Sequence, residues 1–135
     1  MIGTPSEGRS ERGSVSIVAA AIMTIVAVMT LATADLAQVL VASGRAQAAA
    51  DSAALAAAQE LALPRSGSSP AQVATEYAVR NGGTLIECRC EIGSVEATVI
   101  AEVETGPLLL LLGERHVQAR ARAVVGTDLS GTDPG

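Results

Sequence analysis

The chain has 135 residues, a net charge of −5, no Phe or Trp and a single Tyr, Tyr77. Aromatic side chains supply much of the apolar area that globular cores bury, so this core must be built from small side chains. The negative net charge gives no sign of the basic surface patch that nucleic-acid-binding proteins carry, so nucleic acid is not an expected partner.

The first element is a charge-free apolar run over residues 13–34, followed by Asp35. Roughly 20 such residues in a helix cross a hydrocarbon layer about 30 Å thick. Arg9 and Arg12 precede the run, which predicts a cytoplasmic segment over residues 1–13 and an extracytoplasmic C-terminal part. The expected localisation is therefore the cell membrane, with a single pass.

A secretory signal is the competing interpretation of the same run. The sequence Ala32-Thr33-Ala34 fits a signal-peptidase site, and cleavage after Ala34 would release a soluble binding module that begins at Asp35. The apolar core of residues 15–31 is longer than the usual ~7–15 residues of a signal, and the helical pattern continues past the site. A retained anchor is the preferred interpretation, and the secreted module stays as the alternative.

The next stretch is rich in alanine and has no proline before Pro64. Its good helix formers predict one helix over residues 14–63, which spans the membrane and continues outside it. Small side chains four residues apart let neighbouring helices approach closely, and they predict a face for packing against other helices, with possible self-association. The other interpretation is that the alanines reflect only codon bias and form a solvated helix without a packing partner. The expected packing residues are Gly44, Ala46, Ala48, Ala50, Ala54 and Ala58.

These residues carry a family resemblance. Arg12-Gly13, the apolar run, Asp35, Arg45 and the alanine-rich residues 48–58 resemble the N-terminal region of TadE/TadG-type tight-adherence (Tad/Flp) pilus-assembly proteins. The chain is most similar to the short TadE-like proteins of high-GC Gram-positive bacteria. The resemblance implies a membrane-anchored, pilin-like accessory component of a Tad/Flp pilus-assembly or secretion system, with other Tad proteins as partners.

One departure from the pattern of related pilins concerns processing. In those proteins a Gly is followed, five positions later, by a Glu within the apolar segment, whereas here Gly13 is followed by Val18. A carboxylate in a membrane is costly and is kept only for a function. Its absence argues against prepilin-type cleavage after Gly13 and against a role as the major filament subunit.

A linker and a short helix follow. Turn-forming residues predict a linker over residues 64–69. Ser69 as N-cap and Gln72 three positions later form a capping box, so a helix should begin immediately after Ser69. The Asn-Gly-Gly sequence at residues 81–83 should end it, and Tyr77 should anchor it on a sheet.

The remaining residues alternate with a period of two in three stretches, which predicts a three-stranded antiparallel sheet. The fold class is therefore α+β: a long N-terminal helix, then a small extracytoplasmic domain over residues 70–125. Glutamates on the outer face of the second strand should oppose arginines on the third. Residues 126–135 lack an apolar pattern and predict a disordered tail. The inward positions are Ile86, Cys88, Cys90 and Ile92, then Val95, Ala97, Val99, Ala101 and Val103, then Val117, Ala119, Ala121, Ala123 and Val125.

Cys88 and Cys90 lie on one face of the first strand. Oxidation is possible outside the cytoplasm, but residues two apart in a strand lie near the upper limit of disulfide Cα spacing. A Cys88–Cys90 bridge, a bond to another subunit and two buried thiols all stay open. These cysteines and the single histidine, His116, are too few for a metal site. With no phosphate-binding glycine motif either, we expect no enzyme, cofactor or metal.

The last feature is a run of five leucines after Pro107. Five consecutive leucines cannot all face one small sheet. Either a short helical turn packs part of the run against Val73 and Tyr77, or the surplus leucines contact the membrane surface or a partner. The possible contact loop comprises Leu108, Leu109, Leu110, Leu111 and Leu112.

Overall fold

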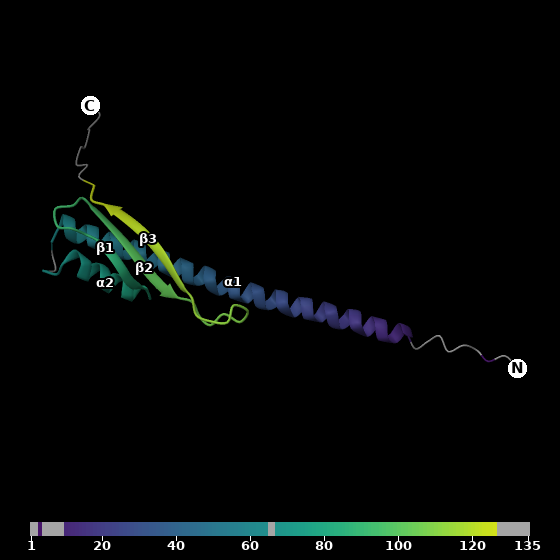
Figure 1. Cartoon of the computed structure of the whole chain (residues 1–135). Coiled ribbons are helices and arrows are strands. Elements are labelled where there is room, and N and C mark those ends of the chain that lie inside the picture. Colours follow the sequence, from purple (N-terminus) through teal and green to yellow (C-terminus); the bar gives the residue numbers. More distant parts are fainter. Residues whose placement is uncertain (1–2, 4–9, 65–66, 127–135) are drawn as a thin grey trace, which may run out of the picture.

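A computed structural model of the chain describes residue 3 and residues 10–64 and 67–126, with only the backbone for residues 10–12. One long helix is followed by a short helix and a three-stranded sheet, so the predicted α+β layout is confirmed (Figure 1). The small domain packs on the C-terminal half of the long helix, whose other half extends away from it. The elements are α1 (Ser10–Ala62), α2 (Pro70–Arg80), β1 (Thr84–Arg89), β2 (Glu96–Glu104) and β3 (His116–Val124).

Helix α1 is continuous, as predicted, because no proline or turn sequence interrupts it. The expected linker of residues 64–69 lies between α1 and α2, although residues 65–66 are outside the described residues. Most of the expected cytoplasmic segment (residues 1–13) and nearly all of the expected tail (residues 126–135) are also outside them. The domain boundaries stay a prediction.

Helix α2 is capped at both ends by local sequence. The Gln72 N–H donates to Ser69 Oγ (3.3 Å) and the Ser69 N–H donates to Gln72 Oε1 (2.9 Å), which confirms the capping box. At the other end the Gly83 N–H donates to the Ala78 carbonyl at 2.9 Å. Gly82 has a φ of +76°, a left-handed conformation that glycine adopts without a steric penalty. The Asn-Gly-Gly sequence therefore ends the helix, as expected.

Tyr77 does not anchor α2 on the sheet, and that expectation is wrong. Helix α2 packs mainly on α1, with Ala74 and Ala78 buried, whereas Tyr77 is 38% exposed. The Arg80 guanidinium lies over its ring, 5.4 Å from the centroid. The two alanines let α2 approach α1 closely, and the large Tyr77 side chain is left at the edge of the groove between the helices.

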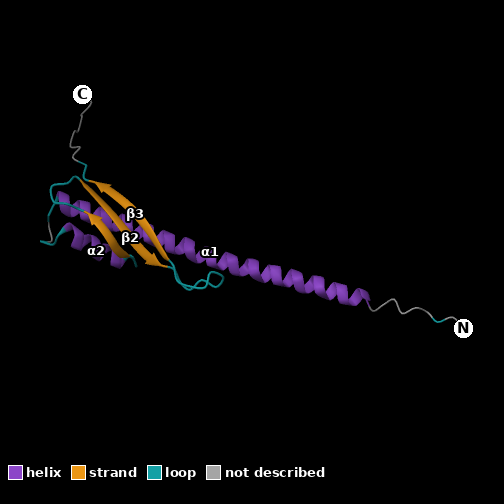
Figure 2. Ribbon diagram, in the orientation of Figure 1, coloured by secondary structure: helices purple, strands orange, loops and turns teal. Residues whose placement is uncertain are grey.

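The sheet is an antiparallel meander with β2 in the centre (Figure 2). The β2–β3 register is regular from the pair Glu96 and Val124 to the pair Glu104 and His116. On β2 the predicted alternation is confirmed, since the inward residues from Ala97 to Val103 are all buried. One face of the sheet therefore lies on α1 and the other is open to solvent.

The predicted inward face of β1 is wrong at its start. The register with β2 shifts between Leu85 and Glu87, which leaves Ile86 unpaired and 50% exposed, while Leu85 packs against the core. An extra residue of this kind reverses the alternation of side chains around it. Ile92 and Val95, also predicted to point inward, lie beyond the strand ends and are exposed.

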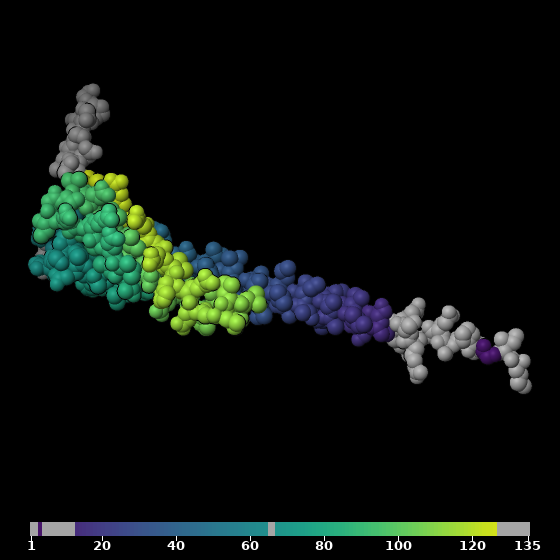
Figure 3. Space-filling view, in the orientation of Figure 1, coloured from purple at the N-terminus to yellow at the C-terminus, as the bar shows by residue number. Residues whose placement is uncertain are grey.

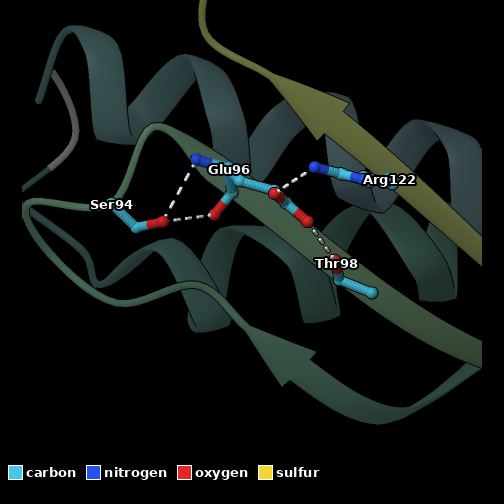
Figure 4. A network of polar contacts seen from close by, with 4 residues as sticks. All are labelled: Ser94, Glu96, Thr98 and Arg122. Atoms are coloured by element: carbon cyan, nitrogen blue, oxygen red, sulfur yellow. Dashed lines mark hydrogen bonds and ion pairs between the residues drawn. The ribbon is translucent and has the colours of Figure 1, made fainter.

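The outer face of the sheet carries one of the expected cross-strand ion pairs between glutamate and arginine. Arg122 on β3 donates to Glu96 on β2 at 2.5 Å, and Thr98 donates to the same carboxylate (Figure 4). Glu102 accepts from Gln118 at 2.7 Å. The Glu96–Arg122 ion pair is partly exposed, so it contributes only about 0–1 kcal/mol.

The core consists almost entirely of alanine. The main cluster joins one face of α1 to α2 and to the sheet, and Val99 is its only member that is not alanine. Small side chains let the backbones come close: a methyl group added at Gly83 would lie 2.7 Å from the Ala49 Cβ. The small-residue core expected from composition is therefore built around α1.

This arrangement corrects the expected role of the alanine face. Four of the proposed packing residues are buried, but against α2 and the sheet of the same chain rather than against other proteins: Ala46, Ala50, Ala54 and Ala58. The spacing of small residues indicates close packing without identifying the partner. Gly44 and Ala48 lie on the exposed side of α1, and their part in helix packing stays a prediction.

Candidate functional site

The N-terminal half of α1 exposes apolar side chains that nothing in the described chain covers. All side chains of residues 13–34 are exposed, and within the described ranges this is the one helix long and apolar enough to cross a membrane (Figure 3). Its threonines are compatible with a lipid environment because their hydroxyls donate to backbone carbonyls of the preceding turn. Thr24 donates to the Ala20 carbonyl at 2.9 Å and Thr30 to the Val26 carbonyl at 2.8 Å.

Asp35, the first residue after this run, connects α1 to the loop that contains the five leucines. It is only 5% exposed, although it lies well before the core alanines on the helix. Its two carboxylate oxygens accept the backbone N–H groups of Leu109 and Leu110, each at 2.8 Å. We call residues 105–115 the leucine loop. It is held at the point where the apolar run of α1 ends.

These hydrogen bonds determine the ionisation of Asp35. The N–H donors of Leu109 and then Leu110 stabilise the carboxylate and lower its pKa below the ordinary 3.8, against an opposing contribution from burial. Asp35 is therefore ionised at neutral pH. Its charge is satisfied by backbone donors rather than by water.

The leucine loop has internal order of its own. Thr105 is 3% exposed, and its hydroxyl donates to the Arg115 carbonyl and accepts the Arg115 N–H, both at 2.9 Å. The Leu108 N–H donates to the Gly113 carbonyl at 3.2 Å. Two links across its base and the bonds to Asp35 at its tip thus hold the loop in one position.

The five leucines differ in burial, and contact of the exposed ones with a membrane or a partner stays a prediction. Leu108 is 3% exposed and packs in the fold, whereas the next four side chains are exposed, up to 87% at Leu112. In Figure 3 the loop lies beside α1 near the middle of the helix. The exposed leucines are Leu109, Leu110, Leu111 and Leu112.

Cys88 and Cys90 are joined in a disulfide with a Cα–Cα distance of 5.4 Å. This spacing is shorter than that of two residues in a regular strand, and β1 ends between the two cysteines, at Arg89. Both side chains pack against the core. The disulfide therefore links the penultimate residue of β1 to the first residue after the strand.

The described residues contain no group of three His, Cys, Asp or Glu side chains placed to hold a metal ion. His116 begins β3 with its side chain 53% exposed, and its Nδ1 lies 3.2 Å from Glu102. The expectation of a non-enzymatic protein stays a prediction. Sequence reasoning had singled out the leucines and had marked Asp35 as the end of the apolar run and part of the family resemblance. It missed the contact between them because no local pattern connects residues so far apart in the chain.

Comparison with known proteins bears on the same part of α1. Residues 13–60 match the family model described as putative Flp pilus-assembly TadE/G-like. No curated protein and no solved structure matches the chain. The match covers the exposed apolar half of α1, Asp35 and all of the buried core alanines on this helix. Over residues 13–60 the chain is therefore similar to the TadE/G-like family of putative Flp pilus-assembly proteins.

Proposed function

We propose that this protein is a single-pass, membrane-anchored and non-enzymatic accessory component of a Tad/Flp pilus-assembly or secretion system. The observation that carries the proposal is the coincidence of the family match with one continuous helix. The first half of that helix presents bare apolar surface, and its second half forms the core of a small domain. Such a helix suits a protein that is fixed in a membrane and presents a domain beside it.

The orientation follows from charge. Arg9 and Arg12 precede the apolar run, and the next arginine along the chain is Arg45. Under the positive-inside rule this asymmetry favours a cytoplasmic N-terminus and an extracytoplasmic domain. An extracytoplasmic location is also compatible with the Cys88–Cys90 disulfide.

An accessory role is favoured over that of the major filament subunit. Val18 replaces the glutamate that related pilins carry five positions after the processing glycine. The alanine face of α1 is covered by the chain's own domain, so it is not free for packing between subunits. Helix contacts with other Tad proteins, or with a second copy, would instead use the exposed side of α1 around Gly44 and Ala48.

Deletion in the native host tests this function. We expect the deletion strain to lose Tad/Flp filaments on its surface, and an intact gene copy to restore them. Filaments sheared from the complemented strain should contain the major subunit without stoichiometric amounts of this chain. Unchanged filaments in the deletion strain would refute a role in assembly, and stoichiometric incorporation would refute the accessory role.

The alternative function is a secreted binding module released after Ala34. It is motivated by Ala32-Thr33-Ala34, which fits a signal-peptidase site. Against it, cleavage there would cut within the continuous helix α1, directly before Asp35 and its bonds to the leucine loop. The protein would then be found in the culture medium with Asp35 as its first residue.

A further inference from the structure

The leucine loop is fixed at one position along the axis of α1. Asp35 directly follows the charge-free run, and it binds the backbone of Leu109 and Leu110. If residues 13–34 span the membrane, Asp35 lies at the boundary between hydrocarbon and headgroups, because one helical turn covers only about 5.4 Å. The loop is therefore held at that boundary by the hydrogen bonds to its tip.

The chemistry of the loop suits a lipid interface. Residues 105–113 carry no charged side chain, and Leu109, Leu111 and Leu112 are each more than half exposed. Asp35, the carboxylate that binds the tip of the loop, is satisfied by two N–H groups and is shielded from solvent. An ionised group that keeps its donors does not need water, so the loop and α1 can enter the interface together.

We propose that the leucine loop inserts Leu109–Leu112 into the lipid interface of the leaflet on the domain's side, as a second membrane contact beside the helical span. This inference rests on the membrane anchoring of the proposed function. Apolar side chains of peripheral segments enter the headgroup–acyl boundary to a depth of about 5–10 Å. With two contacts, the domain is held at a fixed height and orientation rather than rotating freely on one helix.

The opposite end of the sheet offers a matched control. Ile92, in the turn between β1 and β2, is 89% exposed, comparable to Leu112 at 87%. In Figure 1 this turn and the leucine loop lie at opposite ends of β2. If every exposed apolar residue of this domain contacted lipid, Ile92 would contact lipid as the exposed leucines do.

The test uses the full chain in vesicles of phosphatidylcholine and phosphatidylglycerol. Leu111→Cys and Leu112→Cys probe the loop, Ile92→Cys is the control and Val26→Cys marks the middle of the span. The native cysteines stay in their disulfide, so an environment-sensitive fluorophore labels only the introduced thiol. Nitroxide quenchers are attached to lipids either near the headgroup or near the end of the acyl chain. Circular dichroism verifies that each variant keeps its helix and strand content.

We expect the probes at Leu111 and Leu112 to show blue-shifted emission and to be quenched most by the shallow nitroxide. The Val26 probe should be quenched most by the deep one, and the Ile92 probe by neither. Water-like emission at Leu111 and Leu112, with Val26 quenched, overturns the loop inference and leaves the anchor intact. Blue-shifted but unquenched loop probes mean that a second copy covers the leucines, which also overturns it. An unquenched Val26 probe overturns the anchor and the loop inference together.

Discussion

At the scale of single residues, Asp35 joins parts of the chain that are 74 positions apart. Its two oxygens accept two adjacent backbone N–H groups of the leucine loop, which otherwise has few partners at its tip. Unpaired backbone donors that are removed from water are costly, so this carboxylate determines where the loop lies. The consequences concern local order in the loop more than global stability.

Replacing Asp35 with Asn should release the leucine loop. Asparagine has the same size but offers one acceptor oxygen instead of two, and its NH₂ group would face an N–H donor. We expect amide hydrogen exchange at Leu109 and Leu110 to become faster, while exchange in β2 is unchanged. Asp51→Asn is the matched control, because that carboxylate is exposed on α1 and accepts only from Gln47, at 2.8 Å. Equal exchange in wild type and Asp35→Asn would contradict the role of Asp35.

The lowered pKa of Asp35 sets the pH dependence of the same contact. The folded-state pKa lies below the ordinary 3.8, so the stabilisation is fully present above 3.8 and is lost as the pH falls through the folded-state value. The amide proton shifts of Leu109 and Leu110 should therefore titrate with a midpoint below 3.8. A transition above 3.8, or the same titration in Asp35→Asn, would show that Asp35 does not control these amides.

Gly83 should tolerate no side chain, although its own backbone conformation permits one. An added methyl would lie 2.7 Å from the Ala49 Cβ, and both atoms are attached directly to backbone. We expect Gly83→Ala to lower the free energy of unfolding by about 1–3 kcal/mol, the usual cost of overpacking. Thermal unfolding of the full chain in detergent measures this. Gly126→Ala, with open space around its Cβ position, should have almost no effect, and equal effects of the two would refute the close approach.

At the scale of elements, α1 has two halves that share one helix and differ in what covers them. Side chains of residues 13–34 are exposed. The buried alanines between Ala42 and Ala58 instead pack against α2 and the sheet. Alanine gives this second half high helix propensity and a flat surface on which the sheet and α2 lie closely. The small core is a consequence of using alanine, since larger side chains would move α2 and the sheet away from α1.

A matched pair of substitutions tests which side of α1 the domain covers. Ala50 is fully buried, whereas Ala48, two residues away, is exposed. We expect Ala50→Leu to cost about 1–3 kcal/mol of folding free energy through overpacking. Ala48→Leu should change it by no more than about 0.5 kcal/mol, as is usual for a surface site. Chemical unfolding in detergent compares them, and a reversed order would mean that the alanine face packs elsewhere.

The sequence predicted those elements whose signals are local. The capping box of Ser69 and Gln72 lies within one turn, and the alternation on β2 lies within one strand. The bulge at Ile86 was missed because it depends on pairing with β2, which no residue of β1 specifies. The bond from Asp35 to the leucine loop was missed for the same reason, since it depends on the complete fold.

The alanine helix shows a further limit of sequence reasoning. The four-residue spacing of small side chains correctly indicated close packing, but it does not distinguish a partner in the same chain from one in another. In the structure the alanines of α1 and the alanines of β2 form a core with each other.

At the scale of the whole molecule, the exposed side of α1 is the surface left for helix partners. Gly44 has open space around its Cβ position, so Gly44→Leu should leave the fold intact while blocking a close approach of a second helix. We expect energy transfer between labelled chains in vesicles to fall. Ser43→Leu, which adds the same side chain about 100° around the helix, is the control. Unchanged transfer in Gly44→Leu would exclude this face from self-association.

The central claim is that residues 13–34 are retained in the mature protein and hold it in the membrane. Fractionation of the native host, followed by intact-mass measurement, tests it most directly. We expect the protein in the membrane fraction after alkaline carbonate extraction, with a mass that includes these residues. A soluble protein whose mass begins at Asp35 would contradict the membrane anchor and, with it, the proposed position of the leucine loop.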